Sequence, residues 1–197
     1  VLKKSDIILC EDTRRSGKLL SHFQIKKKLQ PYYKFNEKKI SGKVIDFLKK
    51  GKIVSLVSDA GTPTISDPGM ILVSRCINEN FKVYPIPGPS AVTAAMSISG
   101  FGNQFLFYGF LPKKENDLEN TLKNLCSYKY AIIFFISGLK LNYYILKFKK
   151  YFLDRKILIA REMTKIHENF IREDISSINP LSENLKGEFT IVISEKS

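Results

Sequence analysis

The sequence predicts an α/β protein with two α/β domains. Two observations lead to this fold class. Short runs of β-branched residues alternate with amphipathic segments along most of the chain, and the glycine- and proline-rich clusters 57–69 and 85–90 each follow such a run and precede a predicted helix. Because alternating strands and helices form parallel sheets, both clusters are expected at the carboxyl ends of strands, facing one crevice.

The first predicted domain covers residues 1–104. Val44, Phe47 and Leu48 have the spacing of a helix that packs one face on a sheet. Strands are expected at 7–10, 29–33, 53–58 and 83–86, and helices at 16–22, 41–50, 68–80 and 90–99.

The second predicted domain covers residues 105–197 and follows a break at 100–103. The chain contains no low-complexity linker, so we expect the two domains to pack closely around a ligand cleft. Strands are expected at 105–110, 130–135, 156–161, 169–172 and 189–194, and helices at 117–127 and 141–152.

Composition limits the class of protein. The net charge of +13 suits a polyanionic partner such as nucleic acid, but a lysine-, asparagine- and isoleucine-rich composition typical of AT-biased genomes explains it equally well. No apolar run reaches the length of a membrane helix, and three distant cysteines favour free thiols in a reducing, cytoplasmic compartment. The chain has neither a phosphate-loop nor a dinucleotide-binding motif.

The two clusters carry groups suited to a small ligand. Asp59 follows a predicted strand, where its carboxylate can accept hydrogen bonds from an amine or a ribose hydroxyl, and Gly61 allows close backbone approach. Ser90 is predicted to cap a helix of small residues whose free N–H groups suit a carboxylate. A ligand with an amine, a carboxylate and a flat base fits this set. Alternatively, Asp59 and Asp67 only cap turns.

Seven motifs lie along the chain in a fixed order: EDTR at 11–14, SDAGTP at 58–63, ISDPG at 65–69, PGPSA at 87–91, GFLP at 109–112, ARE at 160–162 and KGE at 186–188. This set resembles the bacterial small-subunit (16S) rRNA (cytidine-2′-O)-methyltransferases of the tetrapyrrole methylase superfamily. The resemblance implies two α/β domains with S-adenosylmethionine in the cleft between them, transfer of its methyl group to a ribose 2′-hydroxyl of 16S rRNA, a homodimer, and no metal.

The resemblance also implies roles for particular residues. Because the donor is already activated, alignment of the reacting atoms supplies most of the catalysis, and a base assists. The candidate bases are Glu11, Asp12 and Lys165, the last with Glu168; His22 and His167 receive no role. Arg14, Arg15, Arg161 and Lys165 are candidates for RNA contact, with ion pairs inside their own segments as the equal alternative. The candidate donor-binding residues are Asp59, Ala60, Gly61, Thr62, Pro63, Pro87, Gly88, Ser90, Ala91 and Gly187.

The chain departs from the family pattern at several positions. The family's first strand and its Thr-Pro-Ile-Gly-Asn loop are expected before Val1, so a chain without them is expected to transfer methyl slowly. Phe35, Ile136 and Leu139 occupy positions where the family carries charged or proton-transferring residues. Two alternatives therefore remain: a tetrapyrrole or corrin C-methyltransferase of the same superfamily, and a truncated, non-catalytic rRNA-binding remnant.

Overall fold

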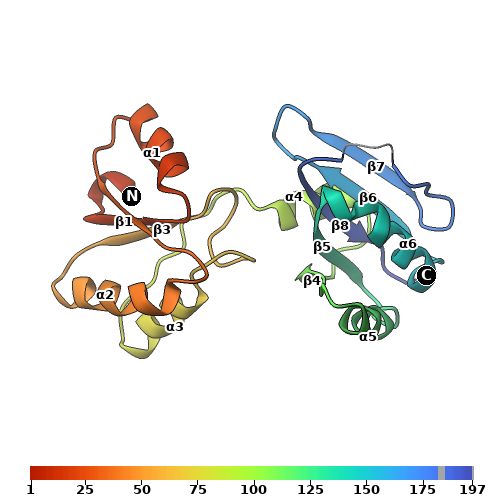
Figure 1. Cartoon of the computed structure of the whole chain (residues 1–197), viewed down its shortest axis with the longest axis horizontal. Helices are drawn as coiled ribbons and strands as arrows, with labels where there is room; N and C mark the ends of the chain where they lie inside the picture. The colour runs from red at the N-terminus through yellow and green to blue at the C-terminus, as the bar shows by residue number, and fades with distance from the viewer. Residues whose placement is uncertain (182–184, 197) are drawn as a thin grey trace. The chain divides into compact units, whose positions relative to one another are not determined.

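The computed structural model describes residues 1–181 and 185–196 and has the mixed α/β architecture that the sequence predicts (Figure 1). The chain divides into two compact units, Val1–Pro89 and Ser90–Ser197, here called the N-terminal and C-terminal units. Among the described residues, no helix is both long and apolar enough to cross a membrane.

The N-terminal unit contains a three-stranded parallel sheet in the order β2-β1-β3. A short 3-10 helix, Leu2–Lys4, precedes the sheet. Helices connect the strands, as parallel pairing requires. In chain order the elements are β1 (Ile7–Cys10), α1 (Thr13–His22), β2 (Lys28–Pro31), α2 (Glu37–Lys49), β3 (Val54–Val57) and α3 (Met70–Asn78).

The central strand β1 is buried along its whole length, because helices cover both faces of the sheet: α1 lies on one side, and α2 with α3 on the other (Figure 1). Leu9 points into the core with α2 and α3, where it meets Val44, Ile45 and Leu72. This packing holds the carboxyl ends of β1 and β3 side by side, with Cys10 opposite Val57.

The C-terminal unit contains a five-stranded mixed sheet in the order β4-β5-β8-β6-β7, in which only β4 and β5 run parallel. Another short 3-10 helix, Gly138–Lys140, follows β5. In chain order the elements are α4 (Ala91–Ser99), β4 (Phe105–Phe110), α5 (Glu115–Leu125), β5 (Ala131–Ser137), α6 (Leu141–Tyr151), β6 (Lys156–Arg161), β7 (Asn169–Asp174) and β8 (Glu188–Ile193).

Helix α4 belongs to the C-terminal unit. Val92 and Ala95 pack on Ala131, Ile133 and other residues of one sheet face, while α5 and α6 cover the opposite face. The unit boundary therefore lies before residue 90, whereas the sequence places it after residue 104. The turn at 100–103 suggested a boundary in the sequence. The apolar contacts of α4 with the sheet place this helix in the C-terminal unit instead.

The expected strand at 83–86 does not form. These residues are neither strand nor helix, and Val83, Tyr84 and Ile86 are exposed. A β-branched run becomes a strand only when a neighbour pairs with its backbone, and no described strand pairs with this one. The expectation of two strand-loop-helix units in series is thus correct for β3 and α3 and wrong for the segment before α4.

Candidate functional site

Three carboxylates lie at the carboxyl ends of β1 and β3. Glu11 and Asp12 directly follow β1, and Asp59 follows β3. The backbone N–H of Asp12 donates to Asp59 Oδ1 at 3.3 Å, which joins the two strand ends. The parallel pairing of β1 with β3 brings these candidates together, because carboxyl ends of neighbouring parallel strands share one sheet edge.

Asp12 is engaged in local structure. Its carboxylate caps α1 by accepting the Arg14 N–H at 2.8 Å, and it forms an ion pair with the Arg14 guanidinium at 2.8 Å. These hydrogen bonds hold the pKa of Asp12 well below its usual range. A group that is both paired and this acidic is a poor proton acceptor, so the geometry gives Asp12 a structural role.

Glu11 lies in a different environment. Partial burial raises the pKa of Glu11, the negative charges of Asp67 and Asp59 raise it further, and Arg15 opposes them. A carboxylate with a raised pKa takes up a proton more readily at neutral pH than an ordinary one. Glu11 is therefore the strongest general-base candidate at this sheet edge.

The turn after Asp59 meets the second glycine- and proline-rich cluster. Asp59 itself pairs with Arg15 at 3.5 Å, and the Thr62 hydroxyl donates to the Pro89 carbonyl at 3.0 Å. Gly61 has φ 75°, and a Cβ there would meet only the Pro89 carbonyl, at 3.9 Å. A Cβ on Gly88 would likewise meet only a backbone oxygen, at 4.0 Å. Both backbones are open to close approach by a ligand.

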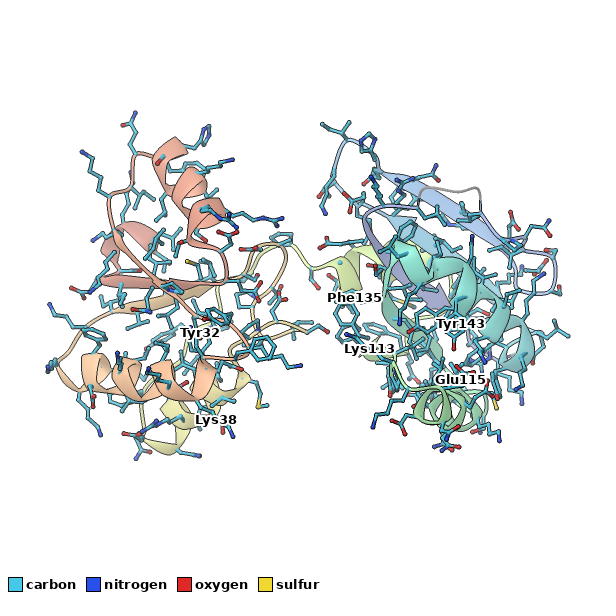
Figure 2. All side chains as sticks on the ribbon, viewed as in Figure 1. Tyr32, Lys38, Lys113, Glu115, Phe135 and Tyr143 are labelled. Atoms are coloured by element: carbon cyan, nitrogen blue, oxygen red, sulfur yellow. The ribbon has the colours of Figure 1, made fainter. Side chains whose placement is uncertain are left out.

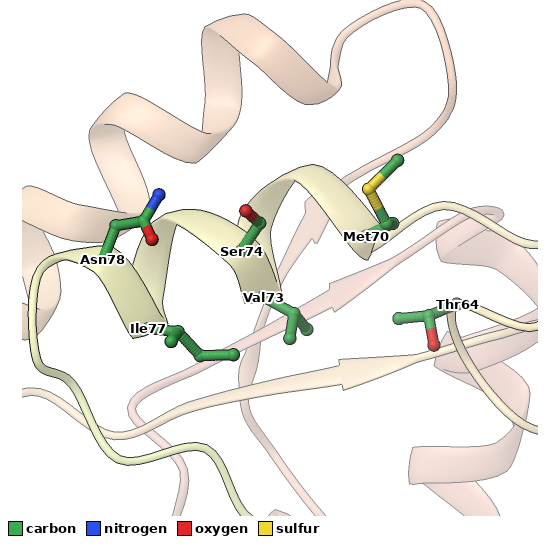
Figure 3. A pocket seen from close by; sticks show the side chains of 6 residues that line it. All are labelled: Thr64, Met70, Val73, Ser74, Ile77 and Asn78. Carbon is green, nitrogen blue, oxygen red and sulfur yellow. The ribbon is translucent and has the colours of Figure 1, made fainter.

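A pocket of about 650 Å³ lies beside Glu11. Its volume suits a small organic ligand. Its other lining residues come from the turn after β2 with the start of α2, and from the loop after β3 with the start of α3: Tyr33, Lys34, Phe35, Glu37, Thr64, Ser66, Asp67, Pro68 and Met70. A smaller hollow of about 320 Å³ shares Thr64 and Met70 and continues along α3 past Val73, Ser74, Ile77 and Asn78 (Figure 3).

Sequence reasoning missed the buried side chain that joins the two walls of the larger pocket. Glu37 is 8% exposed, and its Oε1 accepts the Tyr32 hydroxyl at 3.0 Å and the Gly69 N–H at 2.7 Å. Burial raises the pKa of Tyr32 to about 12. Figure 2 labels Tyr32 inside the N-terminal unit. The sequence gives no signal for this contact, because Glu37 and Gly69 are far apart in the chain and meet only when α2 packs beside α3.

The C-terminal unit begins with the expected helix start. Ser90 has the extended backbone of an N-cap, but its side chain makes no capping hydrogen bond to α4. Ala91 opens the helix. The predicted cap is thus present in backbone geometry alone.

The other candidates of the C-terminal unit form a charged network at one end of its sheet. Lys165 pairs with Glu188 at 2.8 Å and with Glu162 at 3.1 Å, and both contacts raise the pKa of Lys165. Glu162 also accepts the Glu188 N–H at 2.8 Å. Gly187 has φ 113°, and a Cβ there would lie 2.8 Å from Glu162. A lysine held protonated in this way is a cation and not a base.

Arg161 is partly enclosed by its own unit. Its Nη2 donates to the Lys186 carbonyl at 3.1 Å, and its guanidinium lies 5.8 Å from the centre of the Phe189 ring. Its buried Nε has no hydrogen-bond partner among the described residues. Glu168 accepts the Thr164 N–H at 2.6 Å, so it closes the loop after β6.

Neither metal ligands nor disulfides are indicated by the described part of the chain. No group of three or more His, Cys, Asp or Glu residues there could hold a metal ion. Cys10, Cys76 and Cys126 are free thiols.

Known proteins are similar to this chain over nearly its whole length. The family profile "Tetrapyrrole (Corrin/Porphyrin) Methylases" matches residues 1–179. "Ribosomal RNA small subunit methyltransferase I" of Thermotoga maritima is 43% identical, across 99% of this chain and 89% of the relative. The protein of the same name from Mesomycoplasma conjunctivae is 42% identical, across 99% of this chain and 82% of the relative.

Solved structures share the fold. The cobalamin biosynthetic enzyme cobalt precorrin-4 methyltransferase, CbiF, matches with a TM-score of 0.67 and 17% identity, over 98% of this chain and 85% of its own. Uroporphyrin-III C-methyltransferase from Thermus thermophilus, complexed with S-adenosyl homocysteine, matches with a TM-score of 0.63 and 11% identity, over 98% and 87%.

Proposed function

The chain belongs to the tetrapyrrole (corrin/porphyrin) methylase family, and from this premise we propose that it methylates a cytidine ribose 2′-hydroxyl in small-subunit (16S) ribosomal RNA, using S-adenosylmethionine. One observation carries the choice of substrate: relatives at 43% and 42% identity over 99% of the chain are named ribosomal RNA small subunit methyltransferases. The solved structures of cobalamin-pathway and uroporphyrin-III methyltransferases are only 11–17% identical to this chain, so they support the fold alone.

The residues of the N-terminal unit suit the donor. The open backbones at Gly61 and Gly88 leave room for a ligand, and the Asp59 carboxylate can accept hydrogen bonds from an amine or a ribose hydroxyl. The donor supplies a methyl group on a positively charged sulfur. The remaining donor-binding assignments from the sequence, which stay part of this proposal, are Ala60, Thr62, Pro63, Pro87, Ser90, Ala91 and Gly187.

Glu11 is the base in this proposal. The 2′ oxygen bonds to the methyl carbon as the carbon–sulfur bond breaks, and the hydroxyl proton passes to the Glu11 carboxylate. The raised pKa of Glu11 favours this transfer, whereas Asp12 and Lys165 are held in ion pairs. Arg14 and Arg15 are exposed beside the site and are assigned to RNA phosphates, together with Arg161 and Lys165 of the other unit. We further propose a cytoplasmic homodimer that works without a metal.

Methyl transfer from radiolabelled donor to small ribosomal subunits tests the function. The subunits are taken from cells that lack the modification, and the product nucleoside is identified by mass spectrometry. The proposal expects 2′-O-methylcytidine. Label on a base carbon or nitrogen, or label on a tetrapyrrole with none on RNA, would overturn it.

A further inference from the structure

The pocket beside Glu11 has two walls from distant parts of the chain. One wall is the turn Tyr33–Phe35 after β2, and the other is the loop from Thr64 to Met70 before α3. Phe35 is 93% exposed and Tyr33 is 43% exposed, so two aromatic rings stand at the surface of this unit beside a cavity. Because both rings line the same cavity, they offer it an apolar, aromatic surface on which a flat ring can lie.

Hydrogen bonds fix both walls. The Tyr33 N–H donates to the Asn36 side chain at 2.9 Å, and Asn36 Nδ2 donates to the Pro31 carbonyl at 3.1 Å. On the other side, the buried Glu37 carboxylate accepts the Gly69 N–H. Gly69 has φ 142°, and a Cβ there would lie 2.6 Å from Thr64. The cavity is therefore built by its own side chains before any ligand arrives.

The lining chemistry matches a pyrimidine nucleotide with an exocyclic amine. In single-stranded RNA the nucleobases can unstack from one another, and an unstacked base can then stack on an aromatic side chain. The Asp67 carboxylate can accept a hydrogen bond from the cytosine N4 amine, whereas the O4 of uracil is an acceptor and would meet it unfavourably. Lys34 is exposed at the rim, where a phosphate would follow the base.

The walls of this pocket carry carboxylates at Glu11, Glu37 and Asp67, and its lining includes one cation, Lys34, that can contact a phosphate. The neighbouring Glu11 is the proposed base, so a base held in this pocket brings its ribose toward the group that accepts the proton.

We propose that this pocket holds the flipped-out cytosine of the acceptor RNA, stacked on Phe35 and Tyr33 and recognised through its exocyclic amine by Asp67. The inference rests on the proposed function and adds to it the residues that select the nucleobase. The motifs that carry the family resemblance include Asp67, in ISDPG at 65–69, but neither of these aromatic side chains.

The chain contains no tryptophan, so a Phe35→Trp variant carries a single indole at the proposed stacking position. Titration with UCU and UUU trinucleotides is expected to quench its fluorescence, with about tenfold tighter binding of UCU. Asp67→Asn in the Phe35→Trp background is expected to remove this preference, so that UCU and UUU bind about equally. Phe23→Trp is the matched control, since Phe23 is 54% exposed in the same unit and does not line the pocket.

Activity gives the second readout. Phe35→Ala is expected to raise KM for the small subunit about tenfold while KM for the donor stays unchanged; Phe23→Ala is expected to change neither. Equal quenching by UCU and UUU, or quenching by S-adenosylhomocysteine alone, would overturn the inference. If the wild-type chain does not methylate RNA but UCU is still selected, the proposed function fails while the base-binding pocket stands.

Discussion

The Glu37 carboxylate accepts the backbone N–H of Gly69 at 2.7 Å, and this contact joins the start of α2 to the N-cap of α3. The two residues are far apart in the sequence. Their contact fixes the loop that carries Asp67 and thereby the electrostatic environment of Glu11. A buried carboxylate that holds a helix N-terminus is favourably placed, because the helix dipole and the free N–H groups both attract negative charge.

Replacing Glu37 tests how much this contact stabilises the fold. Glu37→Ala leaves the Gly69 N–H buried without its acceptor and leaves the Tyr32 hydroxyl with Ser41 alone, so it should lower the free energy of unfolding by about 2–3 kcal/mol. Glu37→Gln keeps an acceptor oxygen and should cost less. Urea denaturation measures both. Glu79→Ala removes a partly exposed partner of Lys49 and Arg75 and should cost below about 1 kcal/mol. An equal loss for Glu37→Ala and Glu79→Ala would contradict the stabilising role of the Glu37–Gly69 contact.

Removing the proposed base should remove methyl transfer and spare donor binding. Glu11→Gln is expected to lower kcat by about 10²- to 10⁴-fold, the usual contribution of a general base. Isothermal titration with S-adenosylhomocysteine should give an unchanged Kd. Asp46→Asn, on the exposed face of α2, is the control carboxylate and should retain full activity. Wild-type activity in Glu11→Gln would assign the proton transfer elsewhere.

The pH dependence of the reaction should report the environment of Glu11. Because burial, Asp67 and Asp59 raise its pKa, the acidic limb of the kcat/KM profile should lie at higher pH than an unperturbed glutamate would give. Asp67→Asn removes one negative neighbour, so the pKa of Glu11 should fall and the limb should move to lower pH. A limb that stays in place, or moves to higher pH, would contradict the assignment.

Gly187 should tolerate a side chain poorly. In Gly187→Ala the new methyl group meets the Glu162 carboxyl, which holds Lys165 and the Glu188 backbone. We expect a loss of unfolding free energy of about 2 kcal/mol or more, since positive φ alone costs about 1 kcal/mol or more for a non-glycine residue. Gly51→Ala, at φ 72° with open space around it, is the control for a side chain at positive φ without a close contact, and it should cost less than Gly187→Ala.

RNA binding should depend on salt through the exposed arginines. The logarithm of the association constant should fall linearly with the logarithm of salt concentration, and Arg15→Ala should reduce the slope by about 1. Fluorescence anisotropy of a labelled small-subunit RNA fragment measures both slopes. An unchanged slope in Arg15→Ala would confine Arg15 to its ion pair with Asp59.

The elements that the sequence predicts well are those with local causes. The apolar spacing in α2 and the β-branched runs of β1 and β3 carry their own periodicity, so these elements form in the expected segments, although α2 begins at Glu37 and not at residue 41. The segment 83–86 has the same local composition and forms no strand, because pairing depends on a neighbour that local composition cannot specify. Helix α4 was likewise recognised as a helix but placed in the wrong unit, since its packing on Ala131 and Ile133 is a long-range contact.

For the site, the sequence by itself determined the motif residues, the α/β class and the family, because these depend on residue type, order and spacing. Only the tertiary structure decided which of the candidate bases is suited to accept a proton. Glu11 and Asp12 are neighbours in the chain, yet Asp12 is held acidic by Arg14 while burial and Asp67 raise the pKa of Glu11. The physical reason is that a pKa depends on burial and on charges brought close by folding, and the chain places Asp67 beside Glu11 only when α2, β3 and α3 pack together.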